Sequence, residues 1–374
     1  MGALQPPFRP PRRILMGPGP SDVSPRVLLA MARPTIGHLD PAFLALMDEI
    51  AEKLRVVFGS ANEFTLPISG TGSAGMETAL INLLEPGDTA IIGVNGVFGG
   101  RMAEVAQRAG ARVITVEAEW GKPLDVDALV TTHRRHPDAR LLGVVHAETS
   151  TGVLQPLDEL GGYLNETETL FLVDAVTSLG GVPVEVDARR IDVAYSGTQK
   201  CLSVPPGLAP LTLSARAMER VRSRATKVQS WYLDLSLIGA YWGGERAYHH
   251  TAPINALYGL HEGLCAVLEE GVEARYERHS SLGVRLQESL EKRGLELLVE
   301  REYRLPQLTS IRVPAGVNDR EFRRELLERY GIEIGGGLGP LAGQVWRVGL
   351  MGATCRSESV ALFLSALDEL LEGM

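Results

Sequence analysis

Short apolar runs alternate with helix-like stretches between residues 60 and 215, and this alternation limits the possible folds more than any other feature of the chain. Each run has the length of a buried strand, and the stretches between runs have the spacing of amphipathic helices. Such a pattern predicts a mainly parallel sheet covered on both faces. The expected strands are FTLPIS, TAIIGVN, RVITVE, RLLGVVHAE, TLFLVDA, VAYSG and APLTLS. Because ligands bind at the C-terminal ends of such strands, the residues just after each run are the candidates for function.

The rest of the chain predicts a second, smaller domain. Residues 256–294 have the periodicity of one long amphipathic helix, and two strand-like runs further on flank a helix-like segment at 319–331. A length of 374 residues with 45% hydrophobic content is enough to bury both cores. The expected division is an N-terminal arm (1–15), a large domain (16–270) and a small C-terminal α+β domain (271–374).

Composition excludes several classes of function. With 37 basic and 46 acidic residues, the net charge of -9 argues against a nucleic-acid-binding protein. Cys201, Cys265 and Cys355 are too few and too scattered for a disulfide framework or a zinc site, which fits a reducing cytoplasm. The first fifteen residues lack the apolar core of a signal peptide, and no later apolar run is long enough for a membrane span. We therefore expect a cytoplasmic protein without a metal.

The glycine-rich turn Gly70–Gly75 follows a strand-like run and opens a helix. Glycines allow close approach of the backbone, and free N–H groups at a helix N-terminus attract an anion, so this turn is a candidate phosphate site. It also matches the GxGxxG fingerprint of nicotinamide enzymes, although the next strand ends at Asn95 and not at the acidic residue that binds ribose. A tight turn without a ligand stays the alternative.

Asp174 and Lys200 each follow an apolar run. A buried aspartate needs a partner, and a pyridinium nitrogen is a suitable one, although acids at strand ends also cap helices. Lysines that form Schiff bases are desolvated, although an isolated lysine is more often a surface residue. A phosphate loop, an aspartate and a lysine, in this order and each at a strand end, are typical of pyridoxal-phosphate (PLP) transaminases.

Several longer segments carry a specific resemblance. They are MGPGPSDVSPRV, EPGDTAIIGVNGVFGGR, HAETSTGVLQPLDELG, LVDAVTSLGGVPVEVD, YSGTQKCLSVPPG, AYHHTAP and GGLGPLAGQVWRVGLMG. In these segments the chain resembles the class V aminotransferases, most closely the alanine–glyoxylate and serine–pyruvate aminotransferase family. The resemblance implies the fold of type I PLP enzymes, with a seven-stranded, mainly parallel sheet. It also implies transfer of an amino group from alanine or serine to glyoxylate or pyruvate.

The resemblance assigns the residues around the cofactor ring. Lys200 would hold PLP as a Schiff base and then shuttle the proton of the substrate Cα, while Asp174 would pair with the pyridine nitrogen. Val176 would pack beneath the ring. Phe98 stands where the animal enzymes have a stacking tryptophan, so stacking is retained with a smaller ring.

Further positions are assigned to the phosphate and to the substrate. The phosphate ligands would be Thr71, Gly72, Ser73 and the side chain of Gln199, with Ser73 in place of a family histidine. Thr149 would lie near the cofactor's phenolic oxygen and the substrate, and Arg347 would bind the substrate carboxylate through its planar donor fork. Tyr248 and Thr251 resemble the pair that reaches the phosphate from the neighbouring subunit, which implies a homodimer with shared active sites.

Other activities are kept as alternatives. Another class V activity, such as phosphoserine aminotransferase, would need a second basic site that the sequence does not identify. A dehydrogenase and a catalytically silent PLP-binding relative are the more distant possibilities. The sequence does not decide between alanine and serine as donor, or between glyoxylate and pyruvate as acceptor.

Three features are expected to be structural. His249 and His250 are adjacent, which is poor geometry for a metal, so packing and hydrogen bonding are expected. Cys201 is interpreted as a small packing residue. The basic run at 216–227 is interpreted as a solvated helix face.

Overall fold

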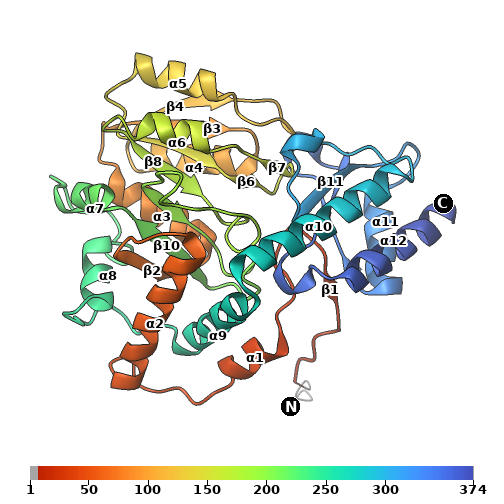
Figure 1. The fold of residues 1–374 in the computed structure, drawn as a ribbon, viewed down its shortest axis with the longest axis horizontal. Coiled ribbons are helices and arrows are strands. Elements are labelled where there is room, and N and C mark those ends of the chain that lie inside the picture. Colours follow the sequence, from red (N-terminus) through yellow and green to blue (C-terminus); the bar gives the residue numbers. More distant parts are fainter. Residues whose placement is uncertain (1–6, 374) are drawn as a thin grey trace, which may run out of the picture.

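The computed structural model describes residues 7–373, and a seven-stranded sheet lies within its larger part, beside the C-terminal elements (Figure 1). The strands are β2 (Phe64–Ser69), β3 (Thr89–Val94), β4 (Arg112–Glu117), β5 (Leu141–Val145), β8 (Leu170–Asp174), β9 (Val193–Tyr195) and β10 (Leu208–Leu213). Their order is β2-β10-β9-β8-β5-β3-β4, and only β10 is antiparallel to its neighbours. Each strand overlaps one of the expected apolar runs, and β10 begins one residue before its run, so the predicted sheet is confirmed.

Helices cover both faces of this sheet because successive residues of its inner strands are apolar on both sides. In β8, Leu170 and Leu172 belong to one hydrophobic core, and Phe171 and Val173 belong to the other. The helices of the first core are α3 (Gly72–Leu83), α4 (Val97–Arg108), α7 (Ala215–Arg222) and α8 (Leu235–Trp242). The helices of the second are α2 (Pro41–Phe58), α5 (Val126–Arg135), α6 (Asp158–Leu164) and α9 (Ile254–Glu270). Helix α1 (Pro25–Met31) contacts α9.

The C-terminal part has a hydrophobic core of its own, in which Phe322 stacks on Trp346 with ring centroids 4.0 Å apart. Its elements are α10 (Val272–Glu291), β11 (Leu308–Arg312), α11 (Asp319–Tyr330), β12 (Ile332–Glu333), β13 (Gly335–Gly336), β14 (Val345–Gly349) and α12 (Ser357–Glu372). The expected helix between two strands is thus confirmed. Of the expected N-terminal arm, residues 1–6 lie outside the described part, and β1 (Ile14–Leu15) pairs with β12.

Two expectations about helices are wrong. Residues 256–294 do not form one helix, because Gly271 adopts a φ of 85° and separates α9 from α10. The basic run at 216–227 is not solvated throughout: Arg222 and Lys227 are exposed, but Arg216 pairs with buried Asp192, and Arg224 donates to carbonyl groups at the C-terminal end of α3. Those carbonyl groups carry the negative end of the helix dipole, which attracts a cation. Within residues 7–373, no helix combines the length and apolar character that a bilayer crossing requires.

Candidate active site

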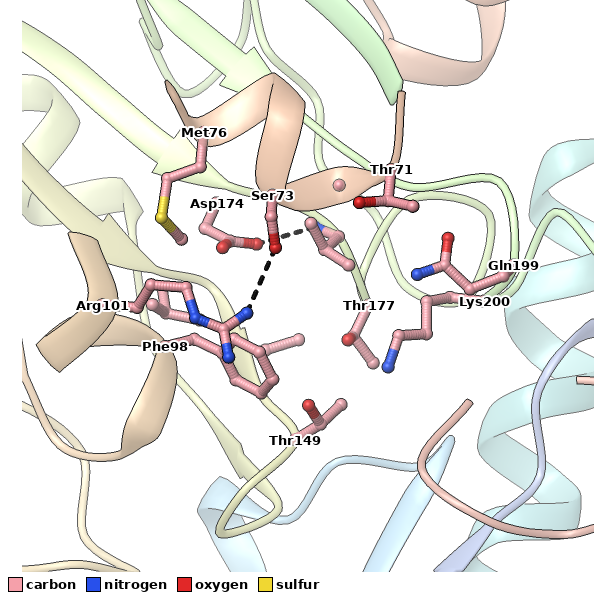
Figure 2. A pocket seen from close by; sticks show the side chains of 14 residues that line it. Thr71, Ser73, Met76, Phe98, Arg101, Thr149, Asp174, Thr177, Gln199 and Lys200 are labelled. Carbon is pink, nitrogen blue, oxygen red and sulfur yellow. Dashed lines mark hydrogen bonds between the residues drawn. The ribbon is translucent and has the colours of Figure 1, made fainter. Parts of the chain in front are cut away.

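One cavity lies at the edge of the large sheet where the parallel strands end (Figure 2). Its walls include residues just after β2, β3, β5, β8 and β9, which is where this fold class places ligands. Most of the side chains selected from the sequence meet here, although they come from distant parts of the chain. They are Thr71, Gly72, Ser73, Phe98, Thr149, Asp174, Val176, Gln199 and Lys200.

The turn after β2 directs the N-terminus of α3 into the cavity. Ala74 N donates to Thr71 O at 2.8 Å, which closes the first turn. The N–H groups of Gly72 and Ser73 come before this hydrogen bond along the helix, so they have no acceptor within the helix. A β carbon on Gly72 would lie 3.0 Å from Val176 Cγ2, so glycine allows the helix to pack close to the cavity wall. N–H groups at the start of a helix favour an anion such as phosphate.

Asp174 ends β8 and places a buried carboxylate in the cavity. Its Oδ1 accepts a hydrogen bond from Val176 N at 2.9 Å, and its Oδ2 accepts one from the Tyr195 hydroxyl at 2.8 Å. Burial raises the pKa of Asp174 to about 6, while these two hydrogen bonds oppose the shift by favouring the ionised form. The carboxylate is therefore ready to pair with a cationic N–H group.

Lys200 follows β9 and is also buried. Burial lowers the pKa of its amine to about 8, which increases the share of the neutral, nucleophilic form near neutral pH. The amine donates a hydrogen bond to Pro18 O. The adjacent Gly19 has a φ of 105°, and a β carbon there would lie 2.6 Å from Lys200 Cδ. The N-terminal segment thus packs closely over the lysine.

Arg101 lines the cavity but was not expected from the sequence. Its guanidinium lies 4.9 Å from the centroid of the Phe98 ring, and its Nη1 donates to Ser73 Oγ at 3.2 Å. It follows Phe98 by three positions on α4, so the shared helix face was the signal that could have identified it. Other cavity residues that the sequence did not single out are Met76, Val145, Ala147 and Thr177.

Arg347, on β14, does not itself line the cavity but is connected to it. Its Nη1 donates to Thr149 O and its Nε to Gly336 O, both at 2.8 Å. Burial lowers the pKa of this guanidinium to about 10, and it stays a cation near neutral pH. These bonds hold Arg347 beside Thr149.

Tyr248 and Thr251 lie outside this cavity, in the segment between α8 and α9. Tyr248 is 63% exposed, and its ring lies 5.2 Å from that of His38. The neighbouring histidines are hydrogen-bonded to each other, with 2.8 Å between His249 Nδ1 and His250 Nδ1. The packing and hydrogen bonding expected for this histidine pair are confirmed.

Cys201 is fully buried in a small hydrophobic cluster, as expected for a packing residue. Burial raises the pKa of its thiol to about 12. At that pKa the nucleophilic thiolate is scarce near neutral pH.

The residues of the cavity fit PLP. A helix N-terminus suits the phosphate, the buried carboxylate of Asp174 suits the ring nitrogen, and the buried amine of Lys200 suits the aldehyde carbon. Phe98 and Val176 supply apolar surface for a flat ring.

Comparison with known proteins agrees with a PLP site in this cavity. The family model for class V aminotransferases matches residues 27–358. Alanine–glyoxylate aminotransferase of Rattus norvegicus is 42% identical, over 99% of this chain and 90% of its own length. (S)-ureidoglycine–glyoxylate transaminase of Bacillus subtilis is 40% identical, over 96% and 91%. The crystal structure of an alanine–glyoxylate aminotransferase from Nostoc sp. aligns with a TM-score of 0.96 at 50% identity, covering 98% and 97%.

Proposed function

The chain belongs to the class V aminotransferases, which are PLP-dependent enzymes, and from this membership we propose that it transfers an amino group from a small amino acid to glyoxylate. The observation that carries the proposal is that Lys200, Asp174 and the N-terminus of α3 line one cavity. These are the groups that a transaminase needs for the aldehyde, the ring nitrogen and the phosphate.

The relatives favour glyoxylate as the acceptor. The names of two of them include glyoxylate, whereas their amino donors, alanine and ureidoglycine, differ. We therefore assign glyoxylate as the preferred acceptor, with pyruvate as the alternative, and alanine or serine as the donor. Arg347 supports a substrate with a carboxylate next to the reacting carbon, since its guanidinium is held beside the cavity by Thr149.

Bound PLP would withdraw electrons from the substrate Cα and accept the amino group. The N–H groups of Gly72 and Ser73, together with the side chains of Thr71, Ser73 and Gln199, would bind the phosphate. Phe98 and Val176 would hold the ring between them.

The remaining residues would act on the substrate and its protons. Lys200 would attach the cofactor and, once displaced by the substrate, move the proton of the substrate Cα as a neutral amine. Asp174 would keep the ring nitrogen protonated through an ion pair that burial strengthens. Arg347 would fix the substrate carboxylate, and the Thr149 hydroxyl would contact the substrate near the phenolic oxygen.

The same proposal includes a homodimer. Tyr248 and Thr251 do not line the cavity of their own chain, and Tyr248 is largely exposed together with Trp231 and Tyr232. Exposed aromatic side chains are enriched at protein interfaces. We therefore assign Tyr248 and Thr251 to the phosphate site of a second copy.

The proposed compartment is the cytoplasm. Cys201, Cys265 and Cys355 are all unpaired, which fits a reducing environment.

A panel of half-reactions tests the substrate assignment. The yellow, PLP-loaded enzyme is mixed with alanine, serine, phosphoserine or aspartate, and the loss of the absorbance of lysine-bound cofactor is followed. Alanine or serine should convert the enzyme, and glyoxylate should then restore the original spectrum faster than pyruvate or 2-oxoglutarate. Faster conversion by phosphoserine than by alanine and serine would establish the alternative activity instead.

A further inference from the structure

Glu148 is fully buried next to the cavity but does not line it, and no step of the proposed reaction uses it. It ends the short strand β6 (Ala147–Glu148). Its Oε1 accepts hydrogen bonds from Ser150 N and Ser150 Oγ at 3.0 and 2.6 Å. Its Oε2 accepts hydrogen bonds from Phe98 N and Gly99 N at 3.1 and 3.4 Å. A buried carboxylate with donors on both oxygen atoms is fully satisfied only as an acceptor.

These contacts cap the N-terminus of α4. The N-cap residue, Gly96, has no side chain, so the first N–H groups of the helix need acceptors from elsewhere. Ser150 Oγ accepts from Val97 N at 3.0 Å, and Glu148 accepts from the next N–H groups. A β carbon on Gly96 would lie 2.5 Å from Glu148 Cδ, so this glycine is required for the carboxylate to reach the helix.

The capped turn carries a wall of the active site. Phe98 lies in this first turn of α4, and its ring lines the cavity. The carboxylate that contacts α4 belongs to Glu148, and the next residue in the chain is Thr149. The carbonyl oxygen of Thr149 accepts the hydrogen bond from Arg347. One carboxylate thus connects the proposed stacking residue with the backbone that holds the proposed substrate arginine.

We infer that Glu148 is a positioning residue for the proposed transamination, and that its carboxylate holds Phe98 against the cofactor ring and in register with Thr149 and Arg347. The inference rests on the proposed function. Glutamine has nearly the same shape but only one acceptor end, so Glu148→Gln would turn an NH₂ group toward donors on α4 or on Ser150. The first turn of α4 would then lose its fixed position.

The dissociation constant of PLP tests this role. It is measured by fluorescence titration in the wild type, E148Q, F98A and the variant with both changes. In the wild-type background, E148Q should weaken PLP binding about tenfold, the factor that corresponds to about 1.4 kcal/mol. In an F98A background, the same change should have less than about a twofold effect, because no ring is left to position. The circular dichroism of the bound cofactor should decrease in E148Q, and the KM of the amino donor should rise.

The matched control is D192N, which alters another buried carboxylate directly before β9, at the end of the sheet strands away from the cavity, where Asp192 accepts from Phe171 N and pairs with Arg216. It should lower thermal stability without changing PLP affinity.

Unchanged PLP affinity in E148Q, or an equal loss in both backgrounds, would overturn the inference. If E148Q does not fold, S150A should show the same Phe98-dependent loss, and its absence would be equally decisive. Wild-type protein that binds no PLP would refute the proposed function as well.

Discussion

The Tyr195 hydroxyl donates a hydrogen bond of 2.8 Å to Asp174 Oδ2, and both side chains are buried on neighbouring parallel strands. Asp174 and Tyr195 are directly paired in the register of β8 and β9. This hydrogen bond favours the ionised aspartate and opposes the effect of burial. Tyr195 therefore supports the charge that the proposed reaction requires at Asp174.

Replacing Tyr195 with phenylalanine should slow the enzyme without removing PLP. The loss of one hydrogen bond to a charged group costs about 1.5–3 kcal/mol, so turnover should fall by at least about tenfold near neutral pH. The pKa of Asp174 should rise further, so the acid limb of the pH–rate profile should move to higher pH. D174N is the reference for complete loss of the charge. A Y195F profile that overlays the wild type would show that the hydrogen bond has no catalytic consequence.

Asp174 should also make the stability of the cofactor-free protein depend on pH. Its pKa is raised from 3.8 to about 6, so the folded state binds the proton more tightly than the unfolded chain. The stabilisation is present in full below the unfolded value and is lost as the pH rises through about 6. D174N cannot ionise. The free energy of unfolding of D174N minus that of the wild type should therefore rise by up to about 3 kcal/mol when the pH is raised from about 4 to about 8. Urea unfolding at both pH values measures this, and a difference that is independent of pH would contradict the shift.

Lys200→Ala should abolish covalent attachment of PLP while the fold persists, because no other buried amine lines the cavity in the described part of the chain. Borohydride reduction of the wild type, followed by peptide mapping, should label Lys200. As a control, K122A removes an exposed lysine, and this variant should still be labelled at Lys200, like the wild type. A label on any other lysine would disprove the assignment.

Arg347→Ala should raise the KM of every amino donor by roughly a hundredfold, since a charge-assisted contact to the substrate carboxylate is lost. Lysine should rescue poorly because it lacks the planar donor fork. Arg312→Ala, on the neighbouring strand β11, is the matched control and should leave KM unchanged, since Arg312 pairs with exposed Glu296. A normal KM in R347A would place the substrate carboxylate elsewhere.

Shared active sites should be visible by complementation. One inactive variant lacks Lys200, another lacks both Tyr248 and Thr251, and the two are unfolded and refolded together. In a mixed dimer, one site collects all the defects and the other has none. Random pairing makes half of the dimers mixed, so activity should recover to about a quarter of the wild-type value. Inactive mixtures that nevertheless contain dimers by gel filtration would show that each site belongs to one chain.

The large sheet and the chemical centre could be predicted from the sequence because their signals are local. An apolar run determines a buried strand within a few residues, and the position of Asp174 or Lys200 just after such a run places it at the ligand-binding edge. The break at Gly271 could not be read from periodicity, because apolar spacing continues on both sides of it. The partners of the basic run at 216–227 were missed for a related reason, since they lie on other elements.

By itself, then, the sequence determined the strands, the order of the reactive residues and their place at the strand ends. Only the tertiary structure decided what surrounds them: Tyr195 on Asp174, Pro18 over Lys200, and Glu148 at the start of α4. These contacts join residues that are close in space but not along the chain. Burial, hydrogen bonding and the shifts in pKa that they cause depend on that spatial arrangement, and local patterns contain no record of it.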